Sequence, residues 1–116
     1  MGTWYEKRPS KYRAVKVENA NGKFDSMKEA NRYAELLLLQ KAGRVTDLRR
    51  QVKFVLIPSQ TLKNGKHVPP VSYVADFVYV REGHEVVEDC KGYKTAVYQI
   101  KKKLMLYQYN IEIVES

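Results

Sequence analysis

Two aspartates and one lysine have the types and the spacing that phosphodiester chemistry would need. Asp76 and Asp89 stand on either side of an Arg-Glu-Gly-His sequence that predicts a hairpin turn centred between Glu82 and Gly83. Such a turn places Asp76 directly opposite Asp89 on the neighbouring strand. Because side chains alternate along a strand, Lys91 shares their face. We therefore predict two carboxylates and one amine on one face of a hairpin.

This arrangement has an electrostatic cost that a cation would offset. Like charges placed opposite each other destabilise a sheet. Mg2+ or Mn2+ binds through hard oxygen ligands, usually one or two carboxylates plus water. Beside such an ion, Lys91 could position or activate a water molecule and neutralise charge that develops on the phosphate. The alternative is that Lys91 forms exposed salt bridges with both acids and has no catalytic role.

A third acid has two interpretations. The sequence from Ser26 to Glu29 fits a helix capping box, in which the glutamate occupies the third helical position. A carboxylate in the first turn of a helix packed near the strands could instead bind the metal, directly or through water. The sequence leaves both roles open for Glu29.

The charge of the chain indicates a polyanionic partner. Lys and Arg number 21 against 13 Asp and Glu, a net charge of +8 in only 116 residues. DNA is the simplest cause of such an excess. Lys94 and the run Lys101, Lys102 and Lys103 are candidate phosphate contacts, although a solvated helix face would have the same composition.

Other classes of protein fit less well. No stretch approaches the length of a membrane span, and no secretory leader is recognisable. The single cysteine, Cys90, cannot form an internal disulfide. We expect a soluble, cytoplasmic protein.

The order of elements predicts an α/β fold. We expect residues 1–11 to form a flexible basic arm and residues 12–116 to form one domain. Within that domain the sequence predicts a hairpin, a helix, three strands, a second helix and a closing strand. The ranges, in chain order, are a hairpin around Asn21-Gly22, a helix from Ser26 to about Gly43, strands over 51–57, 71–80 and 85–91, a helix from Thr95, and a strand over 111–114.

Helical spacing also predicts which faces are buried. The expected apolar face of the first helix comprises Ala30, Tyr33, Ala34, Leu37 and Leu38. The expected apolar face of the second helix comprises Val97, Ile100, Leu104 and Tyr107. Residues 58–70 are expected to form an irregular connection.

The chain resembles a family of small phage-encoded proteins that is known as a domain of unknown function (DUF1064-like). The resemblance covers residues 11–115 and is carried by FDSMKEANRYAELLLLQKAG, RRQVKFVLIP, YVADFVYVREGHEVVEDCKGYKT and KKKLMLY. That family is similar to the PD-(D/E)XK, or restriction-endonuclease-like, nucleases, which include archaeal Holliday junction resolvases. The resemblance implies a mixed central sheet flanked by two helices.

The same resemblance implies an activity and a site. It implies a Mg2+- or Mn2+-dependent DNA endonuclease in phage replication or recombination, acting as a homodimer on branched DNA such as a Holliday junction. Asp76, Asp89 and the backbone carbonyl of Cys90 would hold the metal, Glu29 would assist, and Lys91 would activate water.

Two further positions bear on the resemblance. Gln51, in RRQVKF, matches a glutamine that relatives carry on the strand after the first helix, where it could orient water or contact phosphate. Ala75 stands where the motif name has proline, and Asp89 stands where glutamate is commoner, but neither departure removes a ligand oxygen. The alternative function is a non-catalytic nucleic-acid-binding accessory protein on the same fold.

Overall fold

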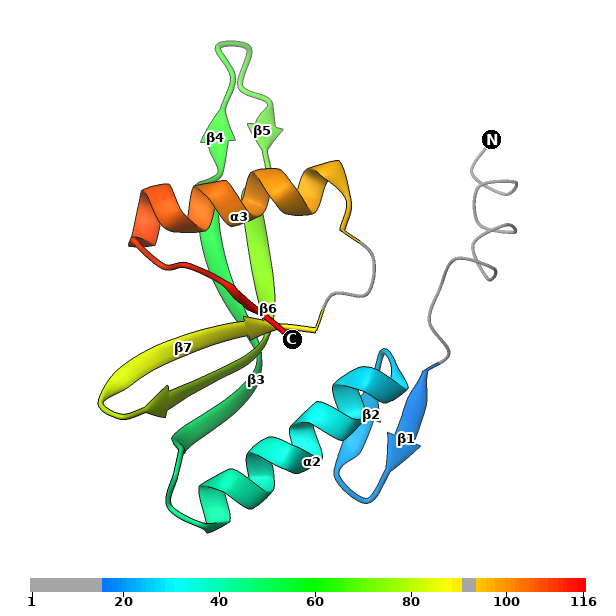
Figure 1. Ribbon diagram of the computed structural model, residues 1–116. Helices are drawn as coiled ribbons and strands as arrows, with labels where there is room; N and C mark the ends of the chain where they lie inside the picture. Colours follow the sequence, from blue (N-terminus) through cyan, green and yellow to red (C-terminus); the bar gives the residue numbers. More distant parts are fainter. Residues whose placement is uncertain (1–15, 91–93) are drawn as a thin grey trace. The chain divides into compact units, whose positions relative to one another are not determined.

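The computed structural model describes residues 16–90 and 94–116, which fall into two compact units (Figure 1). One unit ends at Glu35 and the other runs from Leu36 to Ser116, so the boundary lies within helix α2. The predicted basic arm, residues 1–11, lies outside the described residues. Within the described ranges, no helix is long and apolar enough to cross a membrane.

The first unit contains the predicted N-terminal hairpin. Strand β1 (Val17–Asn19) pairs antiparallel with β2 (Gly22–Phe24). The turn between them ends at Gly22, whose φ of 130° is open to glycine and rare for other residues. The ring of Phe24 lies 5.5 Å from that of Tyr33 on the following helix. The Asn-Gly turn signal is therefore confirmed.

Helix α2 (Met27–Lys41) ends where the sequence predicts. Gly43 has a φ of 77°, and the Arg44 N–H donates to the Leu39 carbonyl at 2.8 Å, as in a left-handed C-terminal cap. The predicted apolar face is wrong in part, because Leu36 is fully buried while Leu38 is 68% exposed. Residues 36–39 are all leucine, so the hydrophobic periodicity of the sequence cannot show which of them is buried.

The second unit is built on a mixed four-stranded sheet with the order β3-β6-β7-β8. Strands β3, β6 and β7 are antiparallel neighbours, and β8 runs parallel to β7. The bounds are β3 (Thr46–Ile57), β6 (Val71–Arg81), β7 (His84–Asp89) and β8 (Val114–Glu115). The described chain is thus α/β with two helices and a mixed sheet, and the predicted fold class is confirmed to this extent.

The connection between β3 and β6 is more regular than predicted. Strands β4 (Gln60–Thr61) and β5 (His67–Val68) form a small hairpin that projects beyond α3 in Figure 1. Its turn is closed by the Leu62 N–H, which donates to the Lys66 carbonyl at 2.8 Å. A two-residue strand is too short for side-chain alternation to reveal it in the sequence.

Helix α3 (Ala96–Tyr109) packs on the sheet and completes the core. It begins as predicted, because the Thr95 hydroxyl accepts a hydrogen bond from the Tyr98 N–H at 3.0 Å. Its buried residues are Tyr98 and Met105. They join a core cluster with Leu56, Tyr73, Ala75, Val78, Val87 and Ile113.

The apolar face predicted for α3 is wrong. Val97 and Ile100 are more than half exposed, Tyr107 is 85% exposed, and Leu104 is only partly buried. The buried residues Tyr98 and Met105 each lie one position after a residue of the predicted face, and Lys101 and Lys102 between them are half-buried. Charged residues beside the buried face obscure the hydrophobic periodicity of the helix.

Candidate active site

Asp76 and Asp89 occupy corresponding places on neighbouring strands. The β6–β7 hairpin has the predicted register, with pairs from Arg81↔His84 to Phe77↔Glu88. Asp76 and Asp89 are the next residues along each strand. The hairpin thus carries both acids to the same end of the β6–β7 ladder.

The Asp76 carboxylate lies against the backbone of the other strand. Its Oδ2 accepts a hydrogen bond from the Cys90 N–H at 2.8 Å, which places it beside the Asp89–Cys90 peptide. Its Oδ1 lies 3.4 Å from the side-chain nitrogen of Gln51, a long hydrogen bond from β3. Three of the predicted site residues are therefore brought together by three adjacent strands.

Asp89 is almost fully buried, with 1% of its surface exposed. Its Oδ2 accepts a hydrogen bond from the Tyr73 hydroxyl at 2.6 Å. Burial raises the pKa of Tyr73, and the hydrogen bond to Asp89 and the Asp89 charge raise it further. The phenol therefore remains protonated and keeps donating to the carboxylate.

The backbone of β3 is unusual at the point nearest the acids. Gln51 has a φ of 53°, in the left-handed region, although it is neither glycine nor asparagine. It lies between the pairs Arg50↔Phe77 and Val52↔Ala75, hence across from Asp76. A left-handed residue of this kind costs roughly 1–2 kcal/mol. Such strain is concentrated at functional sites in proteins.

A second charged group lies where β8 meets α3. Glu115 accepts hydrogen bonds from the Tyr98 hydroxyl at 2.6 Å and from Lys102 at 3.2 Å, and Lys94 lies 2.9 Å from its other oxygen. The Tyr98 hydrogen bond, followed by the Lys94 contact, lowers the pKa of Glu115 to about 2. Burial and the Glu115 hydrogen bond raise the pKa of Tyr98.

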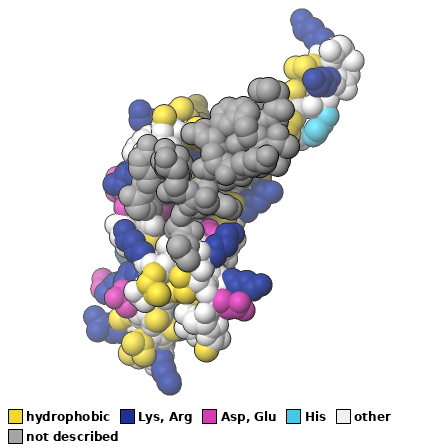
Figure 2. Space-filling view, turned by 90° about the vertical axis from the view of Figure 1, so that its right-hand side faces the viewer, with side chains coloured by type: hydrophobic (Ala, Val, Ile, Leu, Met, Phe, Trp, Pro, Cys, Tyr) yellow, Lys and Arg dark blue, Asp and Glu magenta, His cyan; other side chains and the backbone are white. Residues whose placement is uncertain are grey.

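This cluster divides the predicted DNA-binding lysines into two kinds. Lys94 and Lys102 are ion-paired with Glu115. Lys101 and Lys103 have no ion pair within the described ranges. On the face drawn in Figure 2, Lys and Arg side chains are spread over the surface and not gathered in one patch. On that face, the distribution of charge does not by itself define a DNA-binding surface.

Glu29 forms the helix cap that one interpretation predicted. Its N–H donates to the Ser26 hydroxyl at 3.1 Å, and its Oε1 accepts from the Asp25 N–H at 3.0 Å. The return hydrogen bond is one residue earlier than in the usual capping box. Glu29 belongs to the first unit, and a role in binding metal stays a prediction.

The remaining predicted residues, Cys90 and Lys91, follow β7 in the sequence. Lys91 is outside the described residues, so its place on the face of Asp89 stays a prediction. Cys90 is buried, and its sulfur lies 3.1 Å from the Ser116 hydroxyl. That contact suits a small, packed side chain.

The donor chemistry fits a hard divalent cation with few protein ligands. In the described part of the chain, no group of three or more His, Cys, Asp and Glu side chains could hold a metal ion. Mg2+ needs only one or two carboxylates, with water and substrate oxygens completing its shell. Asp76, Asp89 and the Cys90 carbonyl are the residues that would hold it.

Sequence reasoning missed three residues around the acids: Tyr73, Tyr98 and Glu115. Strict alternation would turn Tyr73 and Val78 to opposite faces, yet both belong to the same core cluster. The alternation is thus offset near Asp76, and no sequence signal marks this offset. The one sequence feature that could have indicated Tyr73 is its position three residues before Asp76.

A family comparison bears on this arrangement. The model of the family described as "Protein of unknown function (DUF1064)" matches residues 9–114, almost the entire chain. The chain belongs to this family. The match of this DUF1064 protein includes every site residue predicted from the sequence and ends one residue before Glu115. Comparison with curated proteins and with solved structures found no match.

Proposed function

We propose that this DUF1064 protein is a metal-dependent DNA endonuclease that hydrolyses phosphodiester bonds with Asp76, Asp89 and Lys91. The main support is the hydrogen bond from the Cys90 N–H to Asp76 at 2.8 Å. It holds one carboxylate beside the peptide that follows the other, immediately before Lys91. An acid pair followed by lysine at this position is the constellation of the PD-(D/E)XK nucleases, which the sequence resembles.

Each residue has a distinct role in the proposed reaction. When bound, Mg2+ or Mn2+ would supply Lewis-acid stabilisation of charge on the phosphate. Asp76 and Asp89 provide the oxygen ligands, and Gln51 and Tyr73 orient these carboxylates through the hydrogen bonds described above. Lys91 positions the attacking water and offsets the growing negative charge. Phosphodiester cleavage with a 5'-phosphate product is the expected chemistry.

The substrate and assembly form the finer part of the proposal. Branched DNA, such as a Holliday junction formed in phage replication or recombination, suits a homodimer, because a symmetric junction presents two equivalent strands to two related sites. This expectation comes from the archaeal Holliday junction resolvases, which belong to the PD-(D/E)XK superfamily that the sequence resembles. The net charge of +8 supports a DNA partner of any shape.

The activity can be tested with one conservative substitution. Purified protein is incubated with four-way junction, flapped, duplex and single-stranded DNA, with Mg2+, Mn2+ or EDTA. We expect metal-dependent cleavage by the wild type and a loss of at least a hundredfold in Asp89→Asn, because the amide keeps the shape of aspartate but is a poor ligand. The matched control is Asp47→Asn at an exposed position, which should cleave as the wild type does.

The rival function predicts a different outcome. An accessory protein that only binds nucleic acid would bind DNA equally well with or without metal and would cleave none of the substrates. Failure of the wild type to cleave any of these DNAs with either metal would replace the nuclease proposal by this one.

A further inference from the structure

The β4–β5 hairpin projects from the second unit and contributes little to its core. Every residue from 57 to 71 is exposed except Val68, which is half-buried. Figure 1 shows the hairpin extending beyond α3. Because it buries so little apolar surface, the hairpin adds little hydrophobic stability to the fold. Its role therefore lies in what its side chains present to a partner.

The turn of the hairpin is held by its own hydrogen bonds. The Gly65 N–H donates to the Leu62 carbonyl at 2.8 Å, and the Lys66 N–H donates to the Asn64 Oδ1 at 2.9 Å. Gly65 has a φ of 88°, the left-handed conformation that favours glycine in hairpin loops of this kind. A partner that binds this turn has little backbone freedom left to remove, which lowers the entropic cost of binding.

The root of the hairpin is fixed to the body of the second unit. The Tyr109 hydroxyl of α3 donates to the Val55 carbonyl near the end of β3 at 2.6 Å. The hairpin joins β3 to β6, and these two strands carry Gln51 and Asp76 of the candidate active site. The hairpin is thus a structured extension of the strands that hold the acids.

The charge of the hairpin has one sign. No Asp or Glu occurs between residues 48 and 75, whereas the hairpin contains Lys63, Lys66 and His67. None of these three has an ion pair within the described ranges. On the face drawn in Figure 2, the projecting end shows Lys or Arg and His side chains and no acidic one. The hairpin also offers uncharged hydrogen-bonding side chains, namely Ser59, Gln60, Thr61 and Asn64. Amines and such side chains together are what contacts to phosphates and base edges use.

The width of the hairpin fits one groove of a duplex. It consists of two strands, which lie about 4.8 Å apart in a sheet, with side chains on both faces. The major groove of B-DNA is about 12 Å wide and admits a two-stranded β-ribbon, while the minor groove is about 6 Å wide. A ribbon with a basic tip therefore complements the major groove and the phosphates on its two sides.

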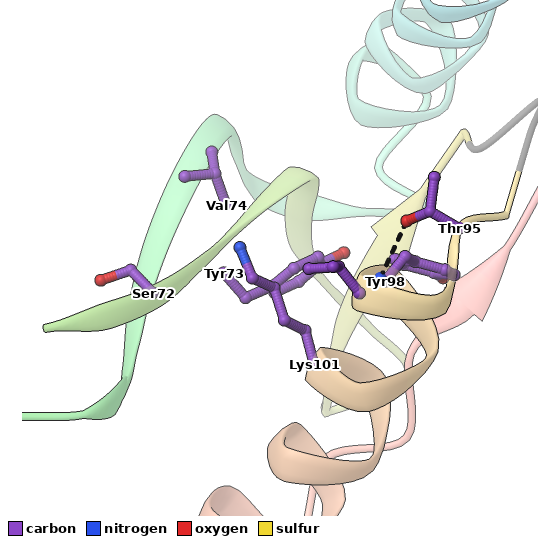
Figure 3. Close-up of a pocket in the computed structure, with 7 residues that line it drawn as sticks. Ser72, Tyr73, Val74, Thr95, Tyr98 and Lys101 are labelled. Atoms are coloured by element: carbon purple, nitrogen blue, oxygen red, sulfur yellow. Dashed lines mark hydrogen bonds between the residues drawn. The ribbon is translucent and has the colours of Figure 1, made fainter.

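The hairpin is close enough to the acids to contact the same duplex. Gly65 at the turn is eleven residues before Asp76. At about 3.3 Å per residue, an extended chain of that length spans at most about 36 Å, close to one helical turn of B-DNA. Between these points, Lys101 extends from α3 toward β6 and lines a groove with Ser72 and Tyr73 (Figure 3). A duplex that passes the acids presents the same groove again within reach of the hairpin.

We propose that the β4–β5 hairpin is a DNA-contacting arm that lies in the major groove of the duplex, with Lys63 and Lys66 on its phosphates. Its position beside the cleaved bond rests on the proposed nuclease function. The arm holds the duplex on one side of the acids, so it fixes the position of the strand that is cut. Phosphate contacts of this kind set the register of a protein on DNA without reading its sequence.

Binding in EDTA tests the arm independently of cleavage. The anisotropy of a fluorescent blunt duplex of 25 base pairs, about two and a half helical turns, is measured at several salt concentrations. Lys63→Ala combined with Lys66→Ala should reduce the slope of log K against log salt by about 1.8, since each phosphate contact contributes about 0.9. The matched control, Lys28→Ala combined with Lys41→Ala, removes two exposed lysines of α2 and should reduce it less. Equal slopes for the two double variants would overturn the proposal.

A modified duplex tests the choice of groove. Glucosylated 5-hydroxymethylcytosine places a sugar in the major groove and leaves the phosphate charge unchanged. Wild-type protein should bind this duplex severalfold more weakly than the unmodified one. A variant in which Asn-Gly replaces residues 60–68 should bind both equally, and urea unfolding checks that its fold is retained. The same loss of affinity in wild type and variant would overturn the placement of the arm in the major groove.

The remaining outcomes separate the arm from its rival and from the proposed function. Binding of polyglutamate that depends on Lys63 and Lys66, without such dependence for DNA, would assign the hairpin to an acidic protein and overturn the proposal. Arm-dependent DNA binding by a protein that cleaves no DNA would retain the arm and remove the nuclease. Cleavage that depends on Asp89, with equal salt slopes for the two double variants, would retain the nuclease and remove the arm.

Discussion

The hydrogen bond between Tyr73 and Asp89 connects stability and chemistry at a single residue. A carboxylate with 1% exposure has little water to hydrogen-bond with and depends on protein donors for that role. Tyr73 supplies one at 2.6 Å and stays protonated because burial and the nearby carboxylate both raise its pKa. The same hydrogen bond fixes the orientation of the Asp89 carboxylate, which the metal site proposed above requires.

Removing this hydroxyl should destabilise the protein. Tyr73→Phe keeps the ring in the core but leaves Asp89 without that donor, so the free energy of unfolding should fall by about 1–3 kcal/mol. Urea unfolding measures this change. The control is Tyr107→Phe, at a side chain 85% exposed, which should be neutral. Equal stability of both variants would show that the Tyr73 hydroxyl does not stabilise the buried carboxylate.

At the scale of elements, strand β3 is conformationally strained where it faces the acids. Gln51 holds a left-handed backbone and directs its amide to Asp76. Glycine would adopt this left-handed conformation without strain, so the presence of glutamine indicates that its side chain has a role at this position.

Substitutions of Gln51 should separate stability from activity. Gln51→Gly relieves the backbone strain and should raise the free energy of unfolding by up to about 1 kcal/mol, while removing the contact with Asp76. Gln51→Ala removes the same contact and keeps the strain. We expect both variants to lose nuclease activity to a similar extent, and only the glycine variant to gain stability in urea unfolding. Unchanged cleavage by both would exclude a role for this amide.

The contact between β8 and α3 should make stability depend on pH. Because the folded pKa of Glu115 is lowered to about 2 from a usual 4.5, its ionised form stabilises the fold above about pH 4.5. That stabilisation is lost as the pH falls toward 2. The stability difference between wild type and Glu115→Gln, from urea unfolding, should therefore shrink from pH 6 to pH 2. The matched control, Glu112→Gln, replaces an exposed acid on the same segment and is measured over the same pH range.

Elements with local signals could be predicted from the sequence, and those decided by tertiary packing could not. The Asn21-Gly22 turn, the Gly43 and Thr95 caps and the β6–β7 register depend on neighbouring residues, and the structure confirms them. Beside the buried face of α3, the half-buried Lys102 hydrogen-bonds to Glu115 on β8, which follows the helix in the sequence. Periodicity alone could not find that partner.

In the candidate site, too, features with a local sequence signal could be predicted and features of the folded backbone could not. The hairpin register places Asp76 beside the strand that ends at Asp89, and the sequence was sufficient to predict this. The contribution of Tyr73 requires an offset in strand alternation, and the left-handed Gln51 has no sequence signature. Both are properties of the folded backbone.

For the whole molecule, the net charge of +8 does not show which lysines of α3 and its approach are available to DNA. Lys94 and Lys102 share one carboxylate, Glu115, which offsets one of their two positive charges, so a phosphate would compete with a carboxylate already 2.9–3.2 Å from these amines. Lys101 and Lys103 have no ion pair to release among the residues that the structure describes. The four lysines of this region should therefore contribute unequally to counterion release.

Duplex binding at several salt concentrations tests this difference. Replacing Lys101 and Lys103 together by alanine should reduce the slope of log K against log salt by about 1.8, since each phosphate contact contributes about 0.9 for duplex DNA. Replacing Lys94 and Lys102 together should reduce it less, because their charge is already offset. Both double variants remove two positive charges, so the general field of the protein changes equally. Equal slopes for the two would mean that net charge alone, and not the pairing with Glu115, governs the attraction to DNA.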